Sequence, residues 1–378
     1  MGSPVRILHA HSTFALGGKE ARAVRLMNAF GEAAEHAVLS AAGPVTAREA
    51  IGRGVRVDFP EDAPPLTGLP GLPRLFRLSR YMRRFDLVLT YNWGSFDAVM
   101  ARHLFGGPPL IHHEDGFNED EAAELKTRRN LYRRLGLSAA WKLVVPSERL
   151  EAVARKAWGQ PPGRVERIPN GIDVARYAVP PAADAVPGLG PGGIVVGTVA
   201  GLRAVKNLPR LVRAFAAMAR KDGRLVIVGA GPESERIAAE ARALGVAGRL
   251  LMPGFLSDPW RWIGRFDIFA LSSDSEQSPI SLIEAMAAGR PCVATAVGDV
   301  PAMVSADNRP LIVEREDEAA FTAALDSLAE RPDLRKAIGR ANREKAAAEY
   351  EEAGMIERYA RLYGEAIGRP GAFTALPS

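Results

Sequence analysis

Short apolar runs alternate with helical patterns along the whole chain. In the first half six such runs predict buried strands, and a helical pattern over Lys19–Phe30 follows the first of them. The strand candidates are Val5–Ala10, Ala37–Ala42, Val55–Phe59, Leu87–Tyr91, Leu110–Ile111 and Lys142–Val145. Because helical patterns fall between most of these strands, the sequence favours parallel βαβ units.

A second series of the same kind follows a Pro- and Gly-rich stretch that runs from Tyr177 to Gly193. Its strand candidates are Ile194–Val199, Leu225–Val228, Leu250–Met252, Ile268–Leu271, Cys292–Thr295 and Leu311–Val313, and its helix candidates are Asn207–Arg220, Pro232–Leu244, Pro279–Ala288 and Glu316–Glu330. We therefore expect an α/β chain with two doubly wound domains and a cleft between them.

The expected boundaries follow from the same pattern. The first domain covers residues 1–177, a linker covers 178–191, and the second domain covers 192–349. Residues 350–378 contain an amphipathic helix over Gly354–Ile367, which we expect to cross back onto the first domain.

The composition excludes several classes of protein. Of 378 residues, 47% are hydrophobic and 25% are charged, so disorder and coiled coil are poor descriptions of the chain. The single cysteine, Cys292, excludes an intramolecular disulfide and a Cys-based zinc cluster, and it fits a reducing, cytoplasmic compartment. No apolar run reaches the ~18 residues of a membrane span, and the first ten residues are too weakly charged and apolar for a signal peptide.

Positive charge is concentrated in two segments of the first half, Gly71–Arg84 and Leu125–Lys142. They hold 11 of the 49 Lys and Arg residues and no acid, so the remaining 38 stand against 44 Asp and Glu. In the first segment Leu75, Leu78, Met82 and Phe85 recur at helical spacing, which is typical of a basic amphipathic helix on an anionic membrane. The second segment is similar, with Leu131, Tyr132, Leu135 and Trp141 among its arginines. The predicted membrane contacts are Arg74, Arg77, Arg80, Arg84, Arg128, Arg129, Arg133 and Arg134. A solvated helix face is the alternative, and nucleic acid is disfavoured because no binding motif accompanies the charge.

The most specific chemistry lies in Ser273–Val300, which reads SDSEQSPISLIEAMAAGRPCVATAVGDV. We expect a strand, a loop and a short helix with Ser278 as N-cap and Pro279 at its first position. The unpaired amides at the start of such a helix form an anion site suited to a phosphate or diphosphate. Glu276 and Glu284 bracket this site, and their carboxylates could accept hydrogen bonds from sugar or ribose hydroxyls.

This stretch closely resembles the donor-site motif of retaining glycosyltransferases of family 4, which have the GT-B fold. Further motifs match in order: the glycine loop Gly17–Glu20, IPNGID at Ile168–Asp173, GTVAGLRAVKNLPRLVRAF at Gly197–Phe215, IVGAGPE at Ile227–Glu233 and MPGFLSD at Met252–Asp258. The resemblance covers nearly the whole chain and implies GT-B architecture, with the acceptor bound by the first domain and the nucleotide sugar by the second.

The resemblance also implies roles for individual residues. Arg203 and Lys206 would clamp the donor diphosphate and stabilise it as it leaves, Glu276 would orient the sugar, and His112 would contact the sugar from the first domain. Donor contacts are implied for Gly17, Gly18, Asn170, Arg203, Lys206, Gly254, Phe255, Glu276, Ser278, Pro279, Ile280, Ser281 and Glu284. His113, Glu114 and Asp115 are candidates for the acceptor site, and His113 is the alternative sugar contact.

Other interpretations of these residues are possible for Phe255, for the two histidines and for the Gly-rich segments. Phe255 could be a core residue rather than a contact of the base. The adjacent histidines His112 and His113 rarely chelate one metal ion together, so we expect no metal site. No Asp-x-Asp occurs, which leaves the two cations and the helix dipole to neutralise the diphosphate without a metal or other cofactor. A NAD-dependent dehydrogenase is disfavoured because the Gly-rich segments that begin at Gly197 and at Gly229 both lack part of the dinucleotide-binding fingerprint.

We therefore expect a retaining glycosyltransferase that uses a nucleoside-diphosphate sugar. Because the basic segments lie in the acceptor domain, we expect a lipid-linked or glycolipid acceptor, an envelope or exopolysaccharide pathway, and peripheral attachment to the inner face of the cytoplasmic membrane. The alternatives are a nucleotide-sugar epimerase of the same fold and a non-catalytic sugar-nucleotide-binding adaptor at membranes.

Overall fold

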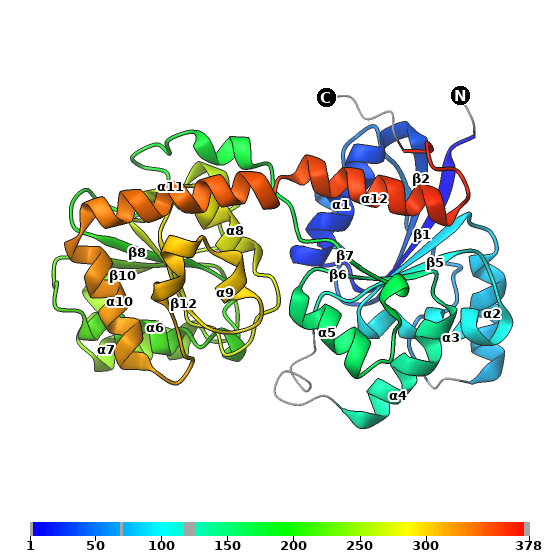
Figure 1. Cartoon of the computed structure of the whole chain (residues 1–378), viewed down its shortest axis with the longest axis horizontal. Coiled ribbons are helices and arrows are strands. Elements are labelled where there is room, and N and C mark those ends of the chain that lie inside the picture. Colours follow the sequence, from blue (N-terminus) through cyan, green and yellow to red (C-terminus); the bar gives the residue numbers. More distant parts are fainter. Residues whose placement is uncertain (1–2, 69–70, 117–125, 374–378) are drawn as a thin grey trace. The chain divides into compact units, whose positions relative to one another are not determined.

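The structure is a computed structural model that describes residues 3–68, 71–116 and 126–373. The chain forms two compact units. Unit 1 comprises residues 1–170 and 353–378, and unit 2 comprises residues 171–352. Each unit has a fully parallel sheet covered by helices, as the alternating pattern predicts (Figure 1).

Unit 1 has a seven-stranded sheet in the order β3-β2-β1-β4-β5-β6-β7. The strands are β1 (Val5–Thr13), β2 (Ala34–Ala42), β3 (Arg56–Asp58), β4 (Leu87–Tyr91), β5 (Leu110–His113), β6 (Lys142–Val145) and β7 (Val165–Arg167). The helices are α1 (Gly18–Phe30), α2 (Leu72–Met82), α3 (Phe96–Phe105), α4 (Thr127–Gly136), α5 (Glu148–Lys156) and α12 (Glu352–Ala366). Apolar residues of α1 and α12 pack on one face of the sheet, and those of α2, α3 and α5 pack on the other.

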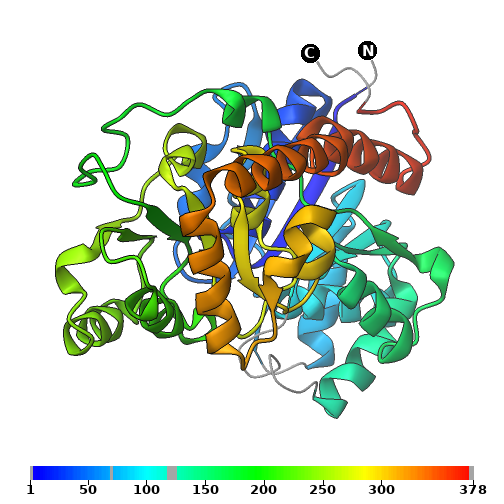
Figure 2. The same ribbon diagram turned by 60° about the vertical axis from the view of Figure 1, so that its left-hand side comes forward.

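Unit 2 has a six-stranded sheet in the order β10-β9-β8-β11-β12-β13. The strands are β8 (Val195–Val199), β9 (Arg224–Val228), β10 (Leu250–Gly254), β11 (Ile268–Leu271), β12 (Cys292–Thr295) and β13 (Ile312–Val313). The helices are α6 (Leu208–Ala217), α7 (Ser234–Ala243), α8 (Ile280–Ala287), α9 (Val300–Met303), α10 (Glu318–Glu330) and α11 (Pro332–Glu349). Residues of α6 and α10 share one apolar cluster and those of α8 another, so they cover opposite faces of the sheet, seen from a second direction in Figure 2.

The division of the chain differs from the expected boundaries. Unit 2 begins at Gly171, and residues 178–191, expected to be a linker, supply Val186 and Leu189 to the unit 2 core. These two side chains are buried, so the Pro- and Gly-rich stretch is an irregular part of a packed domain. At the other end, Tyr359 and Tyr363 of α12 are buried in the unit 1 core.

Candidate functional site

The loops that follow β8 and β11 meet at the carboxyl edge of the unit 2 sheet. Lys206, in the loop after β8, lies with its Nζ 2.6 Å from Oε1 of Glu276, in the loop after β11. Ser273 Oγ donates to the same carboxylate oxygen at 2.6 Å. Two of the residues implied as catalytic are therefore in direct contact and hold each other in place.

Backbone and buried polar contacts lock these two loops together. Asp274 N donates to Val205 O at 2.8 Å, and Ser272 Oγ donates to Asn207 O at 3.0 Å. The Asp274 carboxylate pairs with Arg210 at 2.8 Å. The site is thus built on a loop pair that is fixed before any ligand arrives.

Gly298 packs closely against the backbone of the loop after β11. Its φ is +58°, and a Cβ at this position would lie 2.1 Å from the carbonyl oxygen of Glu276. Asp299 N donates to Gln277 O at 3.2 Å. Only a glycine allows the two segments to approach this closely.

Helix α8 starts one position later than expected. The helix begins at Ile280 with Pro279 in the N-cap position, and Pro279 makes no side-chain capping hydrogen bond, so the prediction of Ser278 as N-cap is wrong. Proline fixes the entry angle and supplies no side-chain acceptor for the first amides. The start of α8, at Ile280 and Ser281, therefore retains the amide hydrogens that suit an anion. At the other end Gly289 follows the C-cap with φ +68°, as predicted.

Glu284 lies within α8 and is 8% exposed. Tyr177 Oη donates to Glu284 Oε1 at 3.1 Å. The sequence gives no local signal for this contact, because Tyr177 stands at the edge of the Pro- and Gly-rich stretch, 107 positions away. Tyr177 is therefore a site residue that the sequence analysis missed.

The remaining implied donor residues of unit 2 lie at the surface. The side chain of Phe255 is 67% exposed, which excludes the alternative of a core residue. Gly254 ends β10 with φ +83°, and its carbonyl accepts from Gly229 N at 2.9 Å. Arg203 is exposed and makes no ion pair with any residue in the described part of the chain. Its charge is thus available to an anion next to the Lys206–Glu276 pair.

In unit 1 the glycine loop leads directly into a helix. Gly17 is the N-cap of α1, and Gly18 is its first residue. Lys19 and Glu20 form an ion pair, and the Lys19 ammonium also donates to Thr13 O at 3.1 Å. The loop is therefore tied to the carboxyl end of β1.

The last two residues of β5, His112 and His113, and Glu114 after them are buried in unit 1. His112 Nδ1 lies 2.8 Å from Thr90 Oγ1, and His113 Nε2 lies 2.9 Å from Tyr363 Oη. Neither ring has exposed surface, and Glu114 is 1% exposed. In this conformation none of the three side chains is available to a sugar or an acceptor, so the structure does not provide the contacts implied for them.

Asp115 and Asn170 both accept hydrogen bonds from the buried Arg22 guanidinium. Both carboxylate oxygens of Asp115 accept from Arg22, one at 2.9 Å, and Asn170 Oδ1 accepts from Arg22 at 3.0 Å. Burial opposes the charge of Asp115, and the positive charge of Arg22 outweighs it, so the pKa of Asp115 lies below its usual value. Asn170 therefore belongs to a unit 1 network centred on Arg22.

The basic segments divide into buried and exposed residues. Arg74 pairs with Asp97, and Arg133 lies between the Trp93 and Trp158 rings with its Nε 3.3 Å from Glu114. Arg74 is 8% and Arg133 1% exposed, which corrects the prediction that they contact a membrane. Their burial is explained by these partners. Leu125, the first residue of the second segment, lies outside the described residues.

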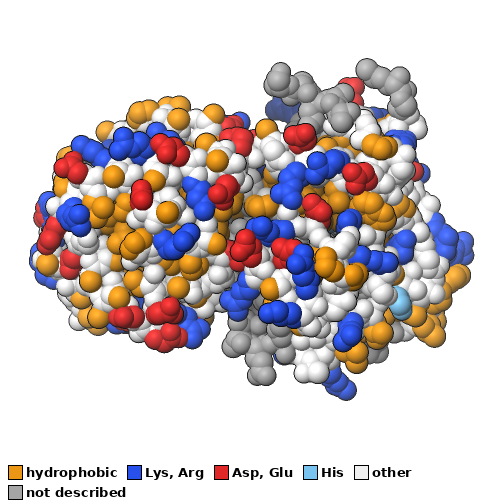
Figure 3. All heavy atoms as spheres, viewed as in Figure 1, with side chains coloured by type: hydrophobic (Ala, Val, Ile, Leu, Met, Phe, Trp, Pro, Cys, Tyr) orange, Lys and Arg blue, Asp and Glu red, His pale blue; other side chains and the backbone are white. Residues whose placement is uncertain are grey.

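The other six arginines stay at or near the surface. Arg77, Arg80, Arg84, Arg128 and Arg134 are exposed, and Arg129 is partly buried over the Trp93 ring. The apolar side chains expected to face a membrane, Leu75, Leu78 and Met82, are instead packed in the core. On α2, Leu72 and Phe76 are exposed instead, whereas Leu131 and Leu135 of the second segment are exposed as expected. Basic and hydrophobic side chains are interspersed on the face drawn in Figure 3.

The described residues show neither a metal cluster nor a membrane-spanning helix. Within residues 3–68, 71–116 and 126–373, no three His, Cys, Asp or Glu side chains are grouped so that they could hold a metal ion. None of the helices described is both long enough and apolar enough to cross a membrane.

Two family models match the chain. Residues 16–176 match Glycosyltransferase Family 4, and residues 182–345 match Glycosyl transferases group 1. The chain is 31% identical over 313 residues to D-inositol 3-phosphate glycosyltransferase of Segniliparus rotundus, covering 75% of this chain and 68% of that protein. It is 26% identical over 170 residues to N-acetyl-alpha-D-glucosaminyl L-malate synthase of Bacillus anthracis, where the match spans less than half of either protein, 45% of each.

Solved structures share the fold. HepE of Anabaena, in complex with UDP, superposes with a TM-score of 0.78 at 17% identity, covering 95% of this chain and all of that one (100%). WaaG, a glycosyltransferase involved in lipopolysaccharide biosynthesis, superposes with a TM-score of 0.66 at 16% identity, covering 98% of this chain and 100% of that one. Both likenesses extend over the two units and identify the GT-B fold.

Proposed function

Because this chain belongs to the family of glycosyl transferases group 1 and, in its first half, to glycosyltransferase family 4, we propose that it transfers a sugar from a nucleoside-diphosphate donor to an acceptor hydroxyl. The observation that carries this proposal is the Lys206–Glu276 pair, joined at 2.6 Å just before the uncapped start of α8. A cation, a carboxylate and free helix amides at one place suit a sugar diphosphate, which is anionic at one end and hydroxylated at the other.

In this proposal the donor diphosphate lies at the start of α8, where Ile280 and Ser281 present their amides. Arg203 and Lys206 neutralise the negative charge that grows on the diphosphate as the glycosidic bond breaks. Electrostatic stabilisation therefore comes from side chains and the helix dipole, and the proposal assigns no role to a metal ion. UDP is the first nucleotide to test, since the structural neighbour HepE was crystallised with it.

The two glutamates take different hydroxyl groups. Glu276 is held by Lys206 and Ser273, and its remaining acceptor capacity is directed to the transferred sugar. Glu284, held by Tyr177, accepts from the ribose hydroxyls of the nucleotide. Phe255, largely exposed, is assigned to the face of the base.

We assign retention of anomeric configuration on the basis of the family. The bond between the anomeric carbon and the diphosphate oxygen breaks, the acceptor oxygen bonds to the same face of that carbon, and the acceptor proton passes to the departing phosphate oxygen. No protein nucleophile is needed for this route. The residues of this chain bind, orient and stabilise charge.

The acceptor is proposed to be lipid-linked or a glycolipid precursor, at the inner face of the cytoplasmic membrane. Exposed Arg77 and Arg80 with exposed Leu72 and Phe76 on α2, and exposed Arg128 with exposed Leu131 on α4, support this assignment, since such surfaces suit anionic headgroups. An envelope or exopolysaccharide pathway fits such an acceptor, and the structural neighbour WaaG acts in lipopolysaccharide biosynthesis.

The experiment that tests the function measures nucleoside-diphosphate release from UDP-, GDP- and ADP-sugars, with and without a lipid-acceptor extract, in buffer containing EDTA. We expect release that depends on the extract, a new glycolipid by mass, and little activity in a Glu276→Gln variant. Conversion of the donor without acceptor would indicate an epimerase. Nucleotide binding without any turnover across all donors and acceptors would indicate a binding adaptor and would contradict the proposal.

A further inference from the structure

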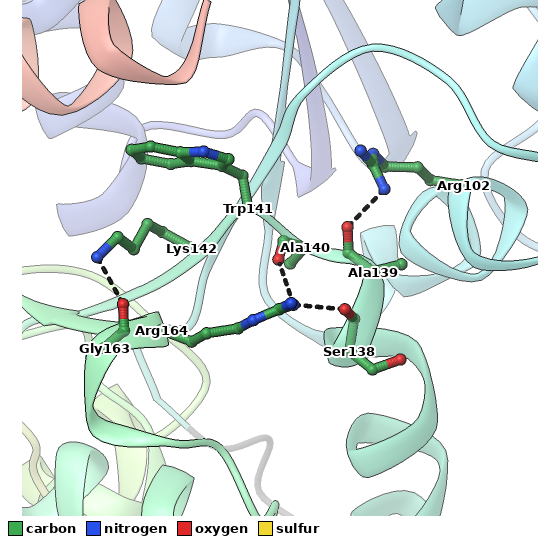
Figure 4. A pocket seen from close by; sticks show the side chains of 8 residues that line it. All are labelled: Arg102, Ser138, Ala139, Ala140, Trp141, Lys142, Gly163 and Arg164. Atoms are coloured by element: carbon green, nitrogen blue, oxygen red, sulfur yellow. Dashed lines mark hydrogen bonds between the residues drawn. The ribbon is translucent and has the colours of Figure 1, made fainter.

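A cationic pocket lies at the amino edge of the unit 1 sheet. Its volume is about 510 Å³. It is lined by Arg102, Ser138, Ala139, Ala140, Trp141, Lys142, Gly163 and Arg164 (Figure 4). Lys142 is the first residue of β6, and Arg164 immediately precedes β7. Because the strands are parallel, this edge is opposite the one where the glycine loop follows β1. The pocket is therefore separate from the sites considered above.

Three cations and no acid line the pocket. Arg102, on α3, donates to Pro108 O at 2.7 Å and to Ala139 O at 2.6 Å. Lys142 Nζ donates to Gly163 O at 2.6 Å, and Arg164 donates to the carbonyl oxygens of Ser138 and Ala140. In the part of the chain that the structure describes, none of the three forms an ion pair with a carboxylate. The backbone fixes their positions but does not neutralise their charge.

Most hydrogen-bond donors of these side chains make no bond to another residue in the described part of the chain. A guanidinium has five N–H donors and an ammonium three. Arg102 and Arg164 each direct two bonds to carbonyls, and Lys142 directs one. Burial, followed by the positive charge of Arg164, lowers the pKa of Arg102, so the charged form of this residue is destabilised in the absence of an anion. An anion in the pocket would relieve that repulsion.

We propose that the pocket formed by Arg102, Lys142 and Arg164 binds a phosphate group. Planar guanidinium groups match phosphate oxygens in pairs, and the ammonium adds a point charge. The phosphate can belong to a membrane lipid or to a small ion. The surroundings favour the lipid, because exposed Leu104 lies two residues after Arg102 on α3, and exposed Leu135 lies three residues before Ser138, whose Oγ donates to the backbone carbonyl of Leu135 at 2.6 Å.

The test compares a Lys142→Gln/Arg164→Gln variant with a control of equal charge, Lys221→Gln/Arg309→Gln. The control side chains also donate to backbone carbonyls, Lys221 to Ala216 O at 2.9 Å and Arg309 to Pro301 O at 3.3 Å, but they lie in unit 2. Circular dichroism and thermal unfolding establish that both variants are folded. Arg102 is left intact because its two carbonyl contacts connect α3 to neighbouring loops.

One arm measures binding of inorganic phosphate by calorimetry, and the other measures cosedimentation with phosphatidylcholine vesicles that contain or lack phosphatidic acid. We expect the pocket variant to bind about ten-fold more weakly in at least one arm, while the control matches the original protein. A loss confined to vesicles identifies a lipid phosphate, and a loss with inorganic phosphate identifies a small ion. If the pocket variant and the control bind alike in both arms, the proposal is wrong.

Discussion

At the scale of single residues, the two cations of the unit 2 site differ, because only one of them is already paired with a carboxylate. Lys206 is paired with Glu276 at 2.6 Å, whereas Arg203 makes no described ion pair. An incoming diphosphate would therefore first meet Arg203 and the amides of α8, and would then share Lys206 with Glu276. In the proposed reaction the pair would orient Glu276 while Lys206 stabilises the leaving group.

Replacement of Lys206 by Met should test this division of roles. We expect kcat to fall by about 10²–10³-fold, since a preorganised group that stabilises developing charge contributes that much. Donor KM should change less, because Arg203 and α8 still bind the diphosphate. Steady-state kinetics on Lys206→Met measures both, and Lys221→Met, at an exposed position, is the control. An unchanged kcat would remove Lys206 from the mechanism.

Tyr177 provides a milder test at the other glutamate. Tyr177→Phe removes only the hydroxyl that donates to Glu284 at 3.1 Å. A hydrogen bond of this kind contributes about 0.5–1.5 kcal/mol, so donor KM should rise roughly 2–10-fold with kcat nearly constant. With a donor that lacks the ribose hydroxyls, the variant and the original protein should have equal KM. A difference that persists with this donor would show that Tyr177 acts elsewhere than through ribose binding.

At the scale of elements, the loop after β11 depends on Gly298. We expect Gly298→Ala to displace the Glu276 backbone, because the new Cβ would lie 2.1 Å from a carbonyl oxygen and φ is +58°. Destabilisation of about 1–3 kcal/mol and a large loss of kcat should appear together in denaturant unfolding and in kinetics. Gly248→Ala is the control, since nothing lies within 4 Å of a Cβ there. Full activity of Gly298→Ala would show that the loop tolerates this shift.

The unit 1 sheet buries several histidines, which should make stability depend on pH. Burial lowers the pKa of His36 to about 4, and burial together with the charge of Arg22 lowers that of His113 to about 3. In the unfolded chain a histidine titrates near 6.5. Between these values the unfolded state binds more protons, so stability is complete above pH ~6.5 and is lost as pH falls toward 4.

We expect the free energy of unfolding to decrease by about 1.4 kcal/mol per pH unit for each such histidine below pH ~6. Urea unfolding at several pH values measures the slope. His36→Asn should reduce it, while His103→Asn, at an exposed side chain, should leave it unchanged. A slope that His36→Asn does not alter would contradict the buried neutral state of this ring.

The sequence pattern predicted central strands such as β4, β6 and β11 because each is an apolar run that is almost entirely buried. It missed β7, Val165–Arg167, because this short edge strand carries two charged residues and resembles a loop. It placed Arg74 and Arg133 at the surface because charge predicts exposure, and periodicity alone does not show that Asp97 and Glu114 lie within reach. Contacts between distant positions, such as Tyr177 with Glu284, leave no local signal.

At the scale of the whole molecule, net charge hides an asymmetry between the two halves of the chain. The net charge is +5, although the two basic segments alone hold 11 cations. Two of these, Arg74 and Arg133, form buried ion pairs. Any attraction to an anionic membrane would therefore come from the exposed arginines and the exposed apolar side chains of these segments. The exposed basic surface of the two segments is therefore smaller than the sequence predicts.

Binding to vesicles should therefore depend on the exposed arginines and on salt. We expect replacement of Arg77, Arg80, Arg128 and Arg134 by Gln to weaken binding to anionic vesicles by at least ten-fold, since each cation near such a surface contributes ~1 kcal/mol. Flotation with phosphatidylglycerol vesicles measures this loss, and four exposed unit 2 arginines replaced in the same way serve as the control: Arg220, Arg236, Arg242 and Arg261.

Binding of the original protein should decrease as ionic strength rises, because salt screens exposed charges. Binding that survives both the substitutions and high salt would show that the apolar side chains alone hold the protein at the surface, and no binding at low salt would remove the membrane from the proposed function.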